Sequence, residues 1–420
     1  MKGIIRNKTV VYGTAIAAFI TGSFFATAYL PNNSYEAGVG LASSTPEKNI
    51  DNKNLASVPA LKPPAVHINT PESVKGIYMT ACVAGTPSWR ENLTKLIETT
   101  ELNSVVIDIK DYSGTISIFS GHPLLEETSQ KGCRVSDMDK FISTLHERGI
   151  YVIGRITVFQ DPYYAIKHPE LAVKKESDGG VWKDYKGLSF IDVSAKPYWE
   201  YIVALSKESY QMGFDELNFD YIRFPSDGNM KDIDFSWSRD KTKAEALREF
   251  FSYLHDELKS SGVVISADLF GMTATNFDDL NIGQILEYTL PYFDYIDPMV
   301  YPSHYPSGFN GYKNVNANTY NIVKFSLDKA VGRTIGTTTT LKLPDNQLIR
   351  VATGTLPALY TKESYPATKI RPWLQDFNYP VTYTPEMVKS QIQATYDAGL
   401  TSWLLWDPAN KYTPSVLKPQ

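Results

Sequence analysis

Acidic residues recur at alternate positions in several short apolar segments. In the segment ELNFD at 216–220, the side-chain period of a β-strand places Glu216, Asn218 and Asp220 on one face and the two apolar residues on the other. Three more segments carry polar residues in the same alternation, and these are Asp108 with Lys110, Ser266 with Asp268, and Asp297 with Tyr301. Paired carboxyl groups suit glycoside hydrolysis, in which one protonates the leaving oxygen and the other attacks the anomeric carbon or activates water. The pattern therefore predicts carbohydrate chemistry.

Asp220 is the leading catalytic candidate. Arg223 follows it closely in DYIRFP at 220–225 and can hold a carboxylate ionised or bind a substrate hydroxyl, which suits a nucleophile or a base. Asp297 and Asp268 are the alternative candidates for the catalytic acid, because crowding of carboxyl groups raises the pKa of one of them. Spacing does not choose between these two.

Polar and aromatic residues of the same segments are the candidate substrate ligands. They are Asp108, Lys110, Arg155, Asn218, Arg223, Tyr301, His304, Trp373 and Trp406. Three structural alternatives stay open: a buried ion pair between Asp108 and Lys110, an Asp268 that only orients an arginine, and core positions for the two tryptophans. His304 has no second histidine at ligand spacing, so no metal ligand is predicted, although strand-end aspartates can also bind Ca²⁺ or Mg²⁺.

These residues need a scaffold that brings strand ends together. Apolar strands alternate with amphipathic helical segments from Val74 onward, which indicates a parallel sheet wrapped by helices, and eight strands predict a (β/α)₈ barrel of the α/β class over residues 73–420. The predicted strands are Lys75–Ala81, Ser104–Lys110, Tyr151–Val158, Glu216–Asp220, Val263–Leu269, Tyr295–Tyr301, Ile370–Gln375 and Ser402–Trp406. The predicted helices are Trp89–Thr100, Val135–Arg148, Pro197–Met212, Lys241–Ser260, Asn318–Lys329 and Pro385–Ala398.

Glycine positions between the predicted elements agree with the predicted barrel. Glycine follows three of the predicted helices, at Gly149, Gly213 and Gly262, where a helix gives way to the next strand. The segment 332–368 is too long for a plain connection, and we expect it to form a hairpin or a lid beside the barrel mouth.

The N-terminal region reads as a targeting segment followed by a linker. Lys2, Arg6 and Lys8 precede an apolar run from Val10 to Leu30, which predicts a signal peptide or a membrane anchor over residues 1–30. Residues 31–72 lack periodic patterning and are expected to be a flexible, disordered linker. We therefore expect an extracytoplasmic protein, either secreted or anchored to the cytoplasmic membrane and facing outward.

The chain has two cysteines, Cys82 and Cys133. Cys82 ends an apolar strand, where a buried thiol is a common filler, so unpaired cysteines are favoured over a disulfide.

Composition narrows the function classes. A net charge of -5 gives no broad basic field, which argues against nucleic acid as a partner. The sequence has no glycine-rich phosphate loop after the first strand and no Gly-x-Ser-x-Gly motif, and no cofactor is expected. The 27 tyrosines supply rings that can pack in a core or line a sugar cleft.

Five segments together resemble the bacterial putative glycosyl hydrolase domain family. They are ELNFDYIRFP at 216–225, SADLFG at 266–271, YIDPMVYPSHY at 295–305, RPWLQDF at 371–377 and WLLWDP at 403–408, within a match from Val74 to Tyr412. The resemblance implies a TIM barrel with Asp220 in the position of a catalytic Asp at the end of the fourth strand. It leaves the acid at either Asp297 or Asp268, and the segment 332–368 is longer than the family's usual connection.

Two hypotheses follow. The first is an extracellular glycoside hydrolase that acts on a polysaccharide or oligosaccharide, and the second is a non-catalytic barrel that binds a glycan at the cell envelope. A polysaccharide deacetylase or lyase has less support, because the usual metal-binding histidines are missing.

Overall fold

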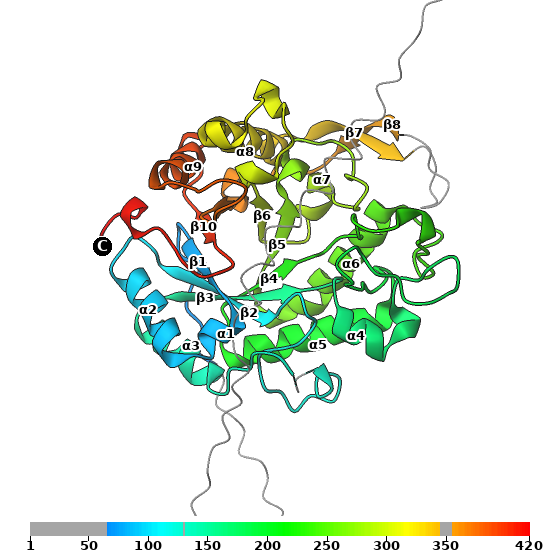
Figure 1. Cartoon of the computed structure of the whole chain (residues 1–420), viewed down its shortest axis with the longest axis horizontal. Helices are drawn as coiled ribbons and strands as arrows, with labels where there is room; N and C mark the ends of the chain where they lie inside the picture. Colours follow the sequence, from blue (N-terminus) through cyan, green and yellow to red (C-terminus); the bar gives the residue numbers. More distant parts are fainter. Residues whose placement is uncertain (1–64, 129–130, 345–354) are drawn as a thin grey trace, which may run out of the picture.

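Eight parallel strands close into a barrel (Figure 1). The computed structural model describes residues 65–128, 131–344 and 355–420. The barrel strands are β1 (Lys75–Met79), β2 (Ser104–Lys110), β3 (Tyr151–Thr157), β4 (Glu216–Asp220), β5 (Val264–Phe270), β6 (Tyr295–Met299), β9 (Trp373–Gln375) and β10 (Trp403–Trp406). They lie in the order β1-β10-β9-β6-β5-β4-β3-β2 around the ring. The predicted (β/α)₈ barrel is confirmed.

Helices surround the strands. The helices are α1 (Ala81–Ala84), α2 (Pro87–Glu98), α3 (Met138–Glu147), α4 (Pro162–Lys167), α5 (Lys196–Met212), α6 (Lys243–Leu258), α7 (Leu286–Thr289), α8 (Thr319–Ile335) and α9 (Pro385–Asp397). Local signals set their ends: α6 begins with a capping box between Thr242 and Glu245, and α5 ends at Gly213, whose φ of 118° suits glycine.

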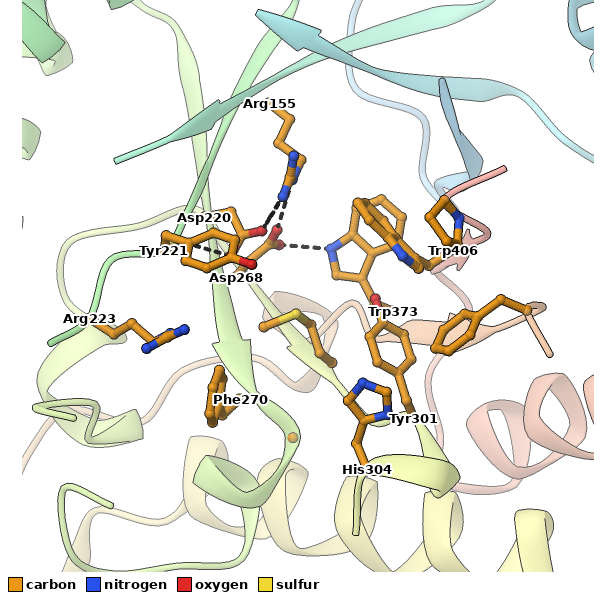
Figure 2. Close-up of a pocket in the computed structure, with 14 residues that line it drawn as sticks. Arg155, Asp220, Tyr221, Arg223, Asp268, Phe270, Tyr301, His304, Trp373 and Trp406 are labelled. Carbon is orange, nitrogen blue, oxygen red and sulfur yellow. Dashed lines mark hydrogen bonds and ion pairs between the residues drawn. The ribbon is translucent and has the colours of Figure 1, made fainter. Parts of the chain in front are cut away.

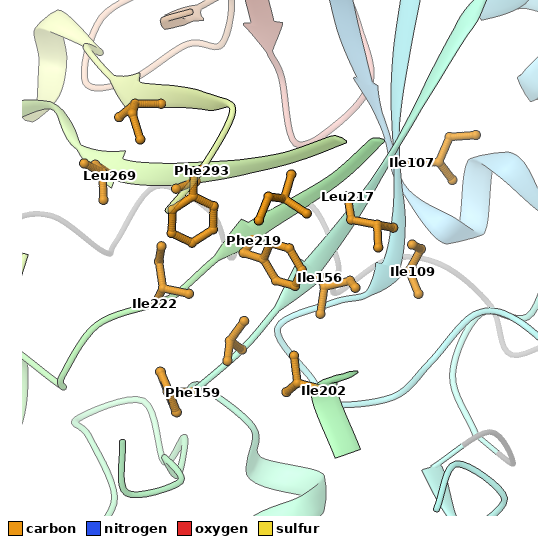
Figure 3. Close-up of a cluster of buried hydrophobic side chains, with 14 of the residues drawn as sticks. Ile107, Ile109, Ile156, Phe159, Ile202, Leu217, Phe219, Ile222, Leu269 and Phe293 are labelled. Carbon is orange, nitrogen blue, oxygen red and sulfur yellow. The ribbon is translucent and has the colours of Figure 1, made fainter. Parts of the chain in front are cut away.

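The main core lies between the strands and the helices. Leu217 and Phe219 of β4 point away from the barrel axis and are fully buried in this layer together with Ile202 of α5 (Figure 3). A smaller apolar cluster, which includes Tyr78, Val106 and Trp373, fills part of the barrel interior. The two faces of β4 thus separate as the alternation predicts, with its polar residues left for the interior.

Strand β2 departs from the predicted alternation. Its register with β3 shifts between Asp108 and Lys110, so Asp108 pairs with Arg155 while Lys110 pairs with Ile156. A bulge of this kind inserts one residue and reorients the side chains that follow. The expectation that Asp108 and Lys110 share one face is therefore wrong.

The long segment after α8 forms a hairpin. Strands β7 (Thr338–Pro344) and β8 (Thr355–Thr361) pair antiparallel. Leu341 is buried with Ala244 and Ile285, and the backbone N–H of Lys342 donates to the carbonyl of Phe277 at 2.7 Å. The hairpin therefore packs beside the α6–α7 region of the barrel.

Residues 65–72, the last part of the predicted linker, lie against the N-terminal ends of the strands. The N–H of Ile68 donates to Asp215 at 2.8 Å, and the hydroxyl groups of Thr70 and Tyr151 are 2.9 Å apart. The predicted targeting segment 1–30 and the rest of the linker lie outside the described residues. Across the ranges that are described, no helix combines the length and apolar character needed to cross a membrane.

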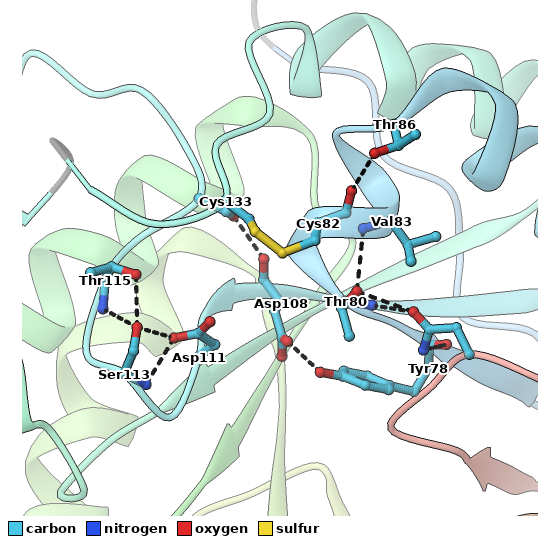
Figure 4. The surroundings of a disulfide bond; sticks show 12 residues. Tyr78, Thr80, Cys82, Val83, Thr86, Asp108, Asp111, Ser113, Thr115 and Cys133 are labelled. Atoms are coloured by element: carbon cyan, nitrogen blue, oxygen red, sulfur yellow. Dashed lines mark hydrogen bonds between the residues drawn. A yellow bond between two sulfur atoms is a disulfide. The ribbon is translucent and has the colours of Figure 1, made fainter. Parts of the chain in front are cut away.

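Cys82 and Cys133 form a disulfide, with their Cα atoms 4.9 Å apart (Figure 4). The expectation of unpaired cysteines is wrong. Cys82 lies in α1 directly after β1, and the loop after β2 returns along that strand through a bond from the N–H of Ser117 to the carbonyl of Ile109 at 2.7 Å. The pairing was hidden in the sequence because the return of this loop depends on tertiary contacts across a separation of 51 residues.

We expect the double variant Cys82→Ser/Cys133→Ser to lose about 2–4 kcal/mol of unfolding free energy, because the disulfide limits the freedom of the unfolded chain. Urea unfolding without reductant measures this loss. The wild type with reductant is the control and should unfold like the double variant. Equal stability of the oxidised wild type and the variant would contradict the prediction.

Candidate active site

A pocket of about 130 Å³ opens at the C-terminal ends of the barrel strands (Figure 2). Barrel enzymes build their active sites at this end of the fold. The pocket is lined by charged residues, aromatic rings and a few small or flexible residues, namely Arg155, Asp220, Tyr221, Arg223, Asp268, Phe270, Gly271, Met299, Tyr301, His304, Trp373, Phe377, Trp406 and Pro408. It therefore joins two of the predicted catalytic aspartates with six of the predicted ligands.

Arg155 is the central cation of the pocket. It donates from Nη1 to Asp108 Oδ1 at 2.7 Å and from Nη2 to Asp220 Oδ2 at 2.5 Å. Its Nε lies 4.0 Å from Asp268 Oδ2, and its guanidinium lies 5.0 Å from the centre of the Trp406 ring. One side chain of β3 thus contacts carboxyl groups from β2, β4 and β5.

Asp220 ends β4 at the pocket wall. Its Oδ2 accepts both bonds from Arg155, and its Oδ1 accepts the backbone N–H of Tyr221 at 2.6 Å. Tyr221 has a φ of 52°, in the left-handed region that non-glycine residues rarely adopt. The chain therefore turns sharply after Asp220, and the carboxylate is held by donors on both oxygens.

Asp268 lies near the end of the neighbouring strand, β5, and faces the same pocket. Its Oδ1 accepts Nδ2 of Asn218 at 2.9 Å and the indole Nε1 of Trp373 at 2.8 Å. Burial, with the nearby Asp220 and Asp297, raises the pKa of Asp268 well above its usual value, while Arg155 and the bond from Asn218 lower it. Because Oδ1 already accepts two donors, Oδ2 is the oxygen suited to carry a proton.

Asp297 lies beneath the pocket and does not line it. It is fully buried, and Arg371 donates to its two oxygens at 3.1 and 2.7 Å. The same guanidinium also contacts both oxygens of Glu216. Burial raises the pKa of Asp297 to about 6, against the lowering effect of Arg371. The structure thus brings Asp268 and Asp220 into one pocket and places Asp297 in an ion cluster below them.

Asn218 connects the two levels. Its Nδ2 lies 2.9 Å from Asp268, 3.1 Å from Asp297 and 3.1 Å from the hydroxyl of Ser266. The side chain is fully buried and does not line the pocket. The sequence predicted that Asn218 binds substrate directly, whereas in the structure it positions Asp268.

Asp108 and Lys110, two further predicted ligands, also stay outside the pocket lining. Asp108 accepts from Arg155 and from the hydroxyl of Tyr78, and burial raises its pKa to about 6. Lys110 contacts Asp161 at 2.9 Å and the carbonyl of Thr157 at 2.7 Å. Each has its own partner, so the alternative of an ion pair between Asp108 and Lys110 is also wrong.

Tyr301, His304, Trp373 and Trp406 do line the pocket, as does Arg223. Burial lowers the pKa of His304 to about 4, so its imidazole is neutral at pH 7. Trp373 and Trp406 meet edge to face with centroids 5.4 Å apart. These rings give the pocket an aromatic wall beside the carboxyl groups (Figure 2).

Several lining residues were not singled out from the sequence, including Tyr221, Phe270, Gly271, Met299 and Phe377. Gly271 had a visible signal, since it follows a strand end. A Cβ at this position would lie 2.4 Å from the carbonyl oxygen of Met299, which explains why glycine is needed. The others follow from loop geometry that spacing does not reveal.

Two features are absent from the described residues. Within the described ranges, no group of three or more His, Cys, Asp or Glu residues is arranged to hold a metal ion. None of the described residues of the β7–β8 hairpin, Thr338–Pro344 and Thr355–Thr361, lines the pocket.

The sequence profile described as "Putative glycosyl hydrolase domain" matches residues 76–412. The chain belongs to this family. No protein with a curated description matches the chain. Among solved structures, a hypothetical protein from Ruminiclostridium thermocellum ATCC 27405 is 38% identical, covering 46% of this chain and 96% of its own, with a TM-score of 0.42.

A second solved structure shares the fold of this glycosyl hydrolase domain over most of its length. The PgaB (BpsB) glycoside hydrolase domain from Bordetella bronchiseptica is 12% identical, with a TM-score of 0.51, and the match covers 80% of this chain and 94% of the other. At this identity the likeness shows a common barrel architecture alone.

In this glycosyl hydrolase domain, we expect Arg371→Met to cost about 3–5 kcal/mol of unfolding free energy, because it leaves Glu216 and Asp297 buried without their cation. Denaturant unfolding monitored by circular dichroism measures the loss. Arg148→Met, which removes a surface guanidinium paired with Glu91 and Glu98, is the matched control and should change stability by less than about 0.5 kcal/mol. Equal effects of the two substitutions would contradict a stabilising role for the cluster.

Proposed function

We propose that this chain is an extracytoplasmic glycoside hydrolase that cleaves a polysaccharide, with Asp220 as nucleophile or base and Asp268 as the catalytic acid. The observation that carries the proposal is that two carboxyl groups from neighbouring strands open into one pocket in different environments. Asp220 is bound by Arg155, whereas burial raises the pKa of Asp268. Such a difference between two adjacent carboxyl groups supports Asp268 as the acid and Asp220 as its partner.

In the proposed reaction, Asp268 Oδ2 gives its proton to the glycosidic oxygen as the bond from that oxygen to the anomeric carbon breaks. Asp220 either bonds to the anomeric carbon and is later released by water, or takes a proton from the attacking water. The separation of the two carboxyl groups decides between these roles, because a nucleophile lies about 5–5.5 Å from the acid and a base that activates water lies about 6.5–9.5 Å from it. The sum of the steps adds one water across one glycosidic bond.

The remaining lining residues support a sugar substrate. Trp373, Trp406, Tyr301 and Phe377 present ring faces and edges, which pack against the apolar faces of sugars. In this proposal Arg155 is a positioning residue. Its ion pairs with Asp108 and Asp220 keep Asp220 oriented toward the anomeric carbon.

The proposed location outside the cytoplasm rests on two independent features. Disulfides persist in oxidising compartments, and Cys82 and Cys133 are paired. The basic residues followed by an apolar run at the start of the chain are typical of a secretory signal or an anchor. Secretion and attachment to the cytoplasmic membrane are both compatible with these features.

We expect Asp220→Asn to lower turnover by about 10³-fold or more while glycan binding is retained, because the amide cannot act as nucleophile or base. Release of reducing ends from a panel of bacterial exopolysaccharides and cell-wall glycans measures turnover, and calorimetry measures binding. Asp256→Asn, an exposed site on α6 paired with Lys259, is the matched control. Glycans that bind the wild type and Asp220→Asn alike but are never cleaved would favour a non-catalytic glycan-binding barrel instead.

We also expect kcat/KM to fall as pH rises through the pKa of Asp268, since the acid must be protonated to act. Asp268→Asn should remove this alkaline limb and lower activity on polysaccharide more than on aryl glycosides, whose leaving groups need little protonation. Comparison of pH profiles for wild type, Asp268→Asn and Asp297→Asn checks the assignment. An alkaline limb that survives in Asp268→Asn and disappears in Asp297→Asn would place the acid at Asp297.

A further inference from the structure

Arg223 is a buried cation with no counter-ion among the residues that the structure describes. Its side chain lines the pocket, yet the residue is only 5% exposed. Arg155, the other arginine of the lining, is paired with Asp108 and Asp220, whereas no carboxylate in the described ranges lies within ion-pair distance of Arg223. The pocket therefore contains one positive charge that the protein does not neutralise directly.

The contacts of Arg223 hold it in place without using all its donors. Nη1 donates to the carbonyl of Phe224 at 3.0 Å and to the hydroxyl of Ser226 at 3.4 Å. The guanidinium lies 5.1 Å from the ring centre of Tyr221 and 5.0 Å from that of Phe270. Nε and Nη2 make no hydrogen bond to any described residue. One edge of a fixed, planar guanidinium is thus left unused.

The acidic residues near Arg223 do not act as its counter-ion. Burial lowers the pKa of Arg223, and Tyr221, Asp220, Asp184 and Asp227 raise it only from a distance. Asp220 is bound by Arg155, and Oδ1 of Asp184 accepts the backbone N–H groups of Lys186 and Leu188 at 2.9 and 2.8 Å. An arginine remains charged even when buried, and a buried charge without a partner is costly. A ligand that supplies the missing anion would offset this cost.

We propose that Arg223 binds an anionic group of the substrate, so that the glycan cleaved here is an acidic polysaccharide with a carboxylate on the sugar bound in the pocket. This inference rests on the proposed hydrolase function for its substrate but not for the binding site itself. A carboxylate fits because it accepts two parallel bonds from one edge of a guanidinium. Figure 2 shows Arg223 on the side of the pocket away from Trp406, so an acidic substituent would point away from the aromatic wall.

Arg223 also offsets the repulsion between an acidic sugar and the carboxyl groups of the pocket. An acidic sugar that enters the pocket meets the carboxyl group of Asp220, which acts as nucleophile or base in the proposed reaction, and like charges at short range repel strongly in a site of low dielectric constant. Arg223 supplies attraction within the same pocket, and Arg155 already balances Asp220. A neutral sugar would leave Arg223 without an anion.

Matched pairs of oligosaccharides test the proposal through binding alone. Each pair consists of an acidic chain and its carboxyl-reduced neutral form, prepared from oligogalacturonides, oligomannuronates, hyaluronan fragments and muramic-acid-containing glycan strands. Calorimetry with full-length Asp220→Asn should show at least one acidic chain bound about 10–100-fold more tightly than its neutral form, the range that hydrogen bonds to a charged group provide. Rising ionic strength should weaken this preference.

Substitution of Arg223 in the Asp220→Asn background locates the site. Arg223→Gln should reduce the ratio of acidic to neutral affinity to about one, and Arg223→Lys should retain part of it. Arg148→Gln, at the opposite end of the barrel, should leave the ratio unchanged. Thermal unfolding of each variant shows whether it is folded, and the ratio measured with Asp220→Asn alone tests the proposal without any substitution at Arg223.

The outcomes separate this inference from the proposed function. Equal binding of acidic and neutral forms, failure to bind any acidic chain, or a preference that survives in Arg223→Gln would overturn the role of Arg223. An acidic preference that depends on Arg223, with no cleavage by the wild type, would support the anion site and count against hydrolysis. Cleavage of neutral glycans alone would support a hydrolase and overturn the acidic substrate.

Discussion

The barrel interior has to hold several carboxyl groups close together away from water, and arginine makes this feasible. Arg155 contacts acids from β2, β4 and β5, and Arg371 binds acids from β4 and β6. Buried charges of one sign are unstable unless they are paired and hydrogen-bonded, so each acid in these clusters has a fixed orientation. The orientation of the carboxyl groups in these clusters follows from how the two guanidinium groups divide their donors.

The two clusters are connected and have different consequences. The lower one, around Arg371, is closed to the pocket and fixes the strand ends from below. Asn218 reaches from this level to Asp268, whose Oδ1 is also occupied by Trp373. The upper cluster opens to the pocket, where Arg155 holds Asp220 and leaves one oxygen of Asp268 free of close donors. The closed cluster around Arg371 supports the cluster around Arg155, so the groups that face the pocket are held in place before substrate binds, as a preorganised site requires.

The sequence predicts the eight strands and six of the helices because their apolar periodicity is strong. It also predicts which residues of β4 and β5 face the interior. Lys110 escapes prediction because a bulge in β2 changes the side-chain alternation, and the disulfide escapes because a loop returns only through tertiary contacts. The sequence leaves Asp268 and Asp297 equivalent, since their difference in depth depends on where Arg371 reaches. The counter-ion state of Arg223 is likewise a property of the packed pocket and has no signature in spacing.

The attachment of residues 65–72 to the N-terminal ends of the strands gives the barrel a defined polarity. The chain enters at the end of the barrel opposite the pocket, through the contacts of Ile68 with Asp215 and of Thr70 with Tyr151. The point where the described chain joins the barrel and the pocket mouth therefore lie on opposite faces. Contacts of Ile68 and Thr70 and contacts with substrate thus occupy separate surfaces, and neither obstructs the other.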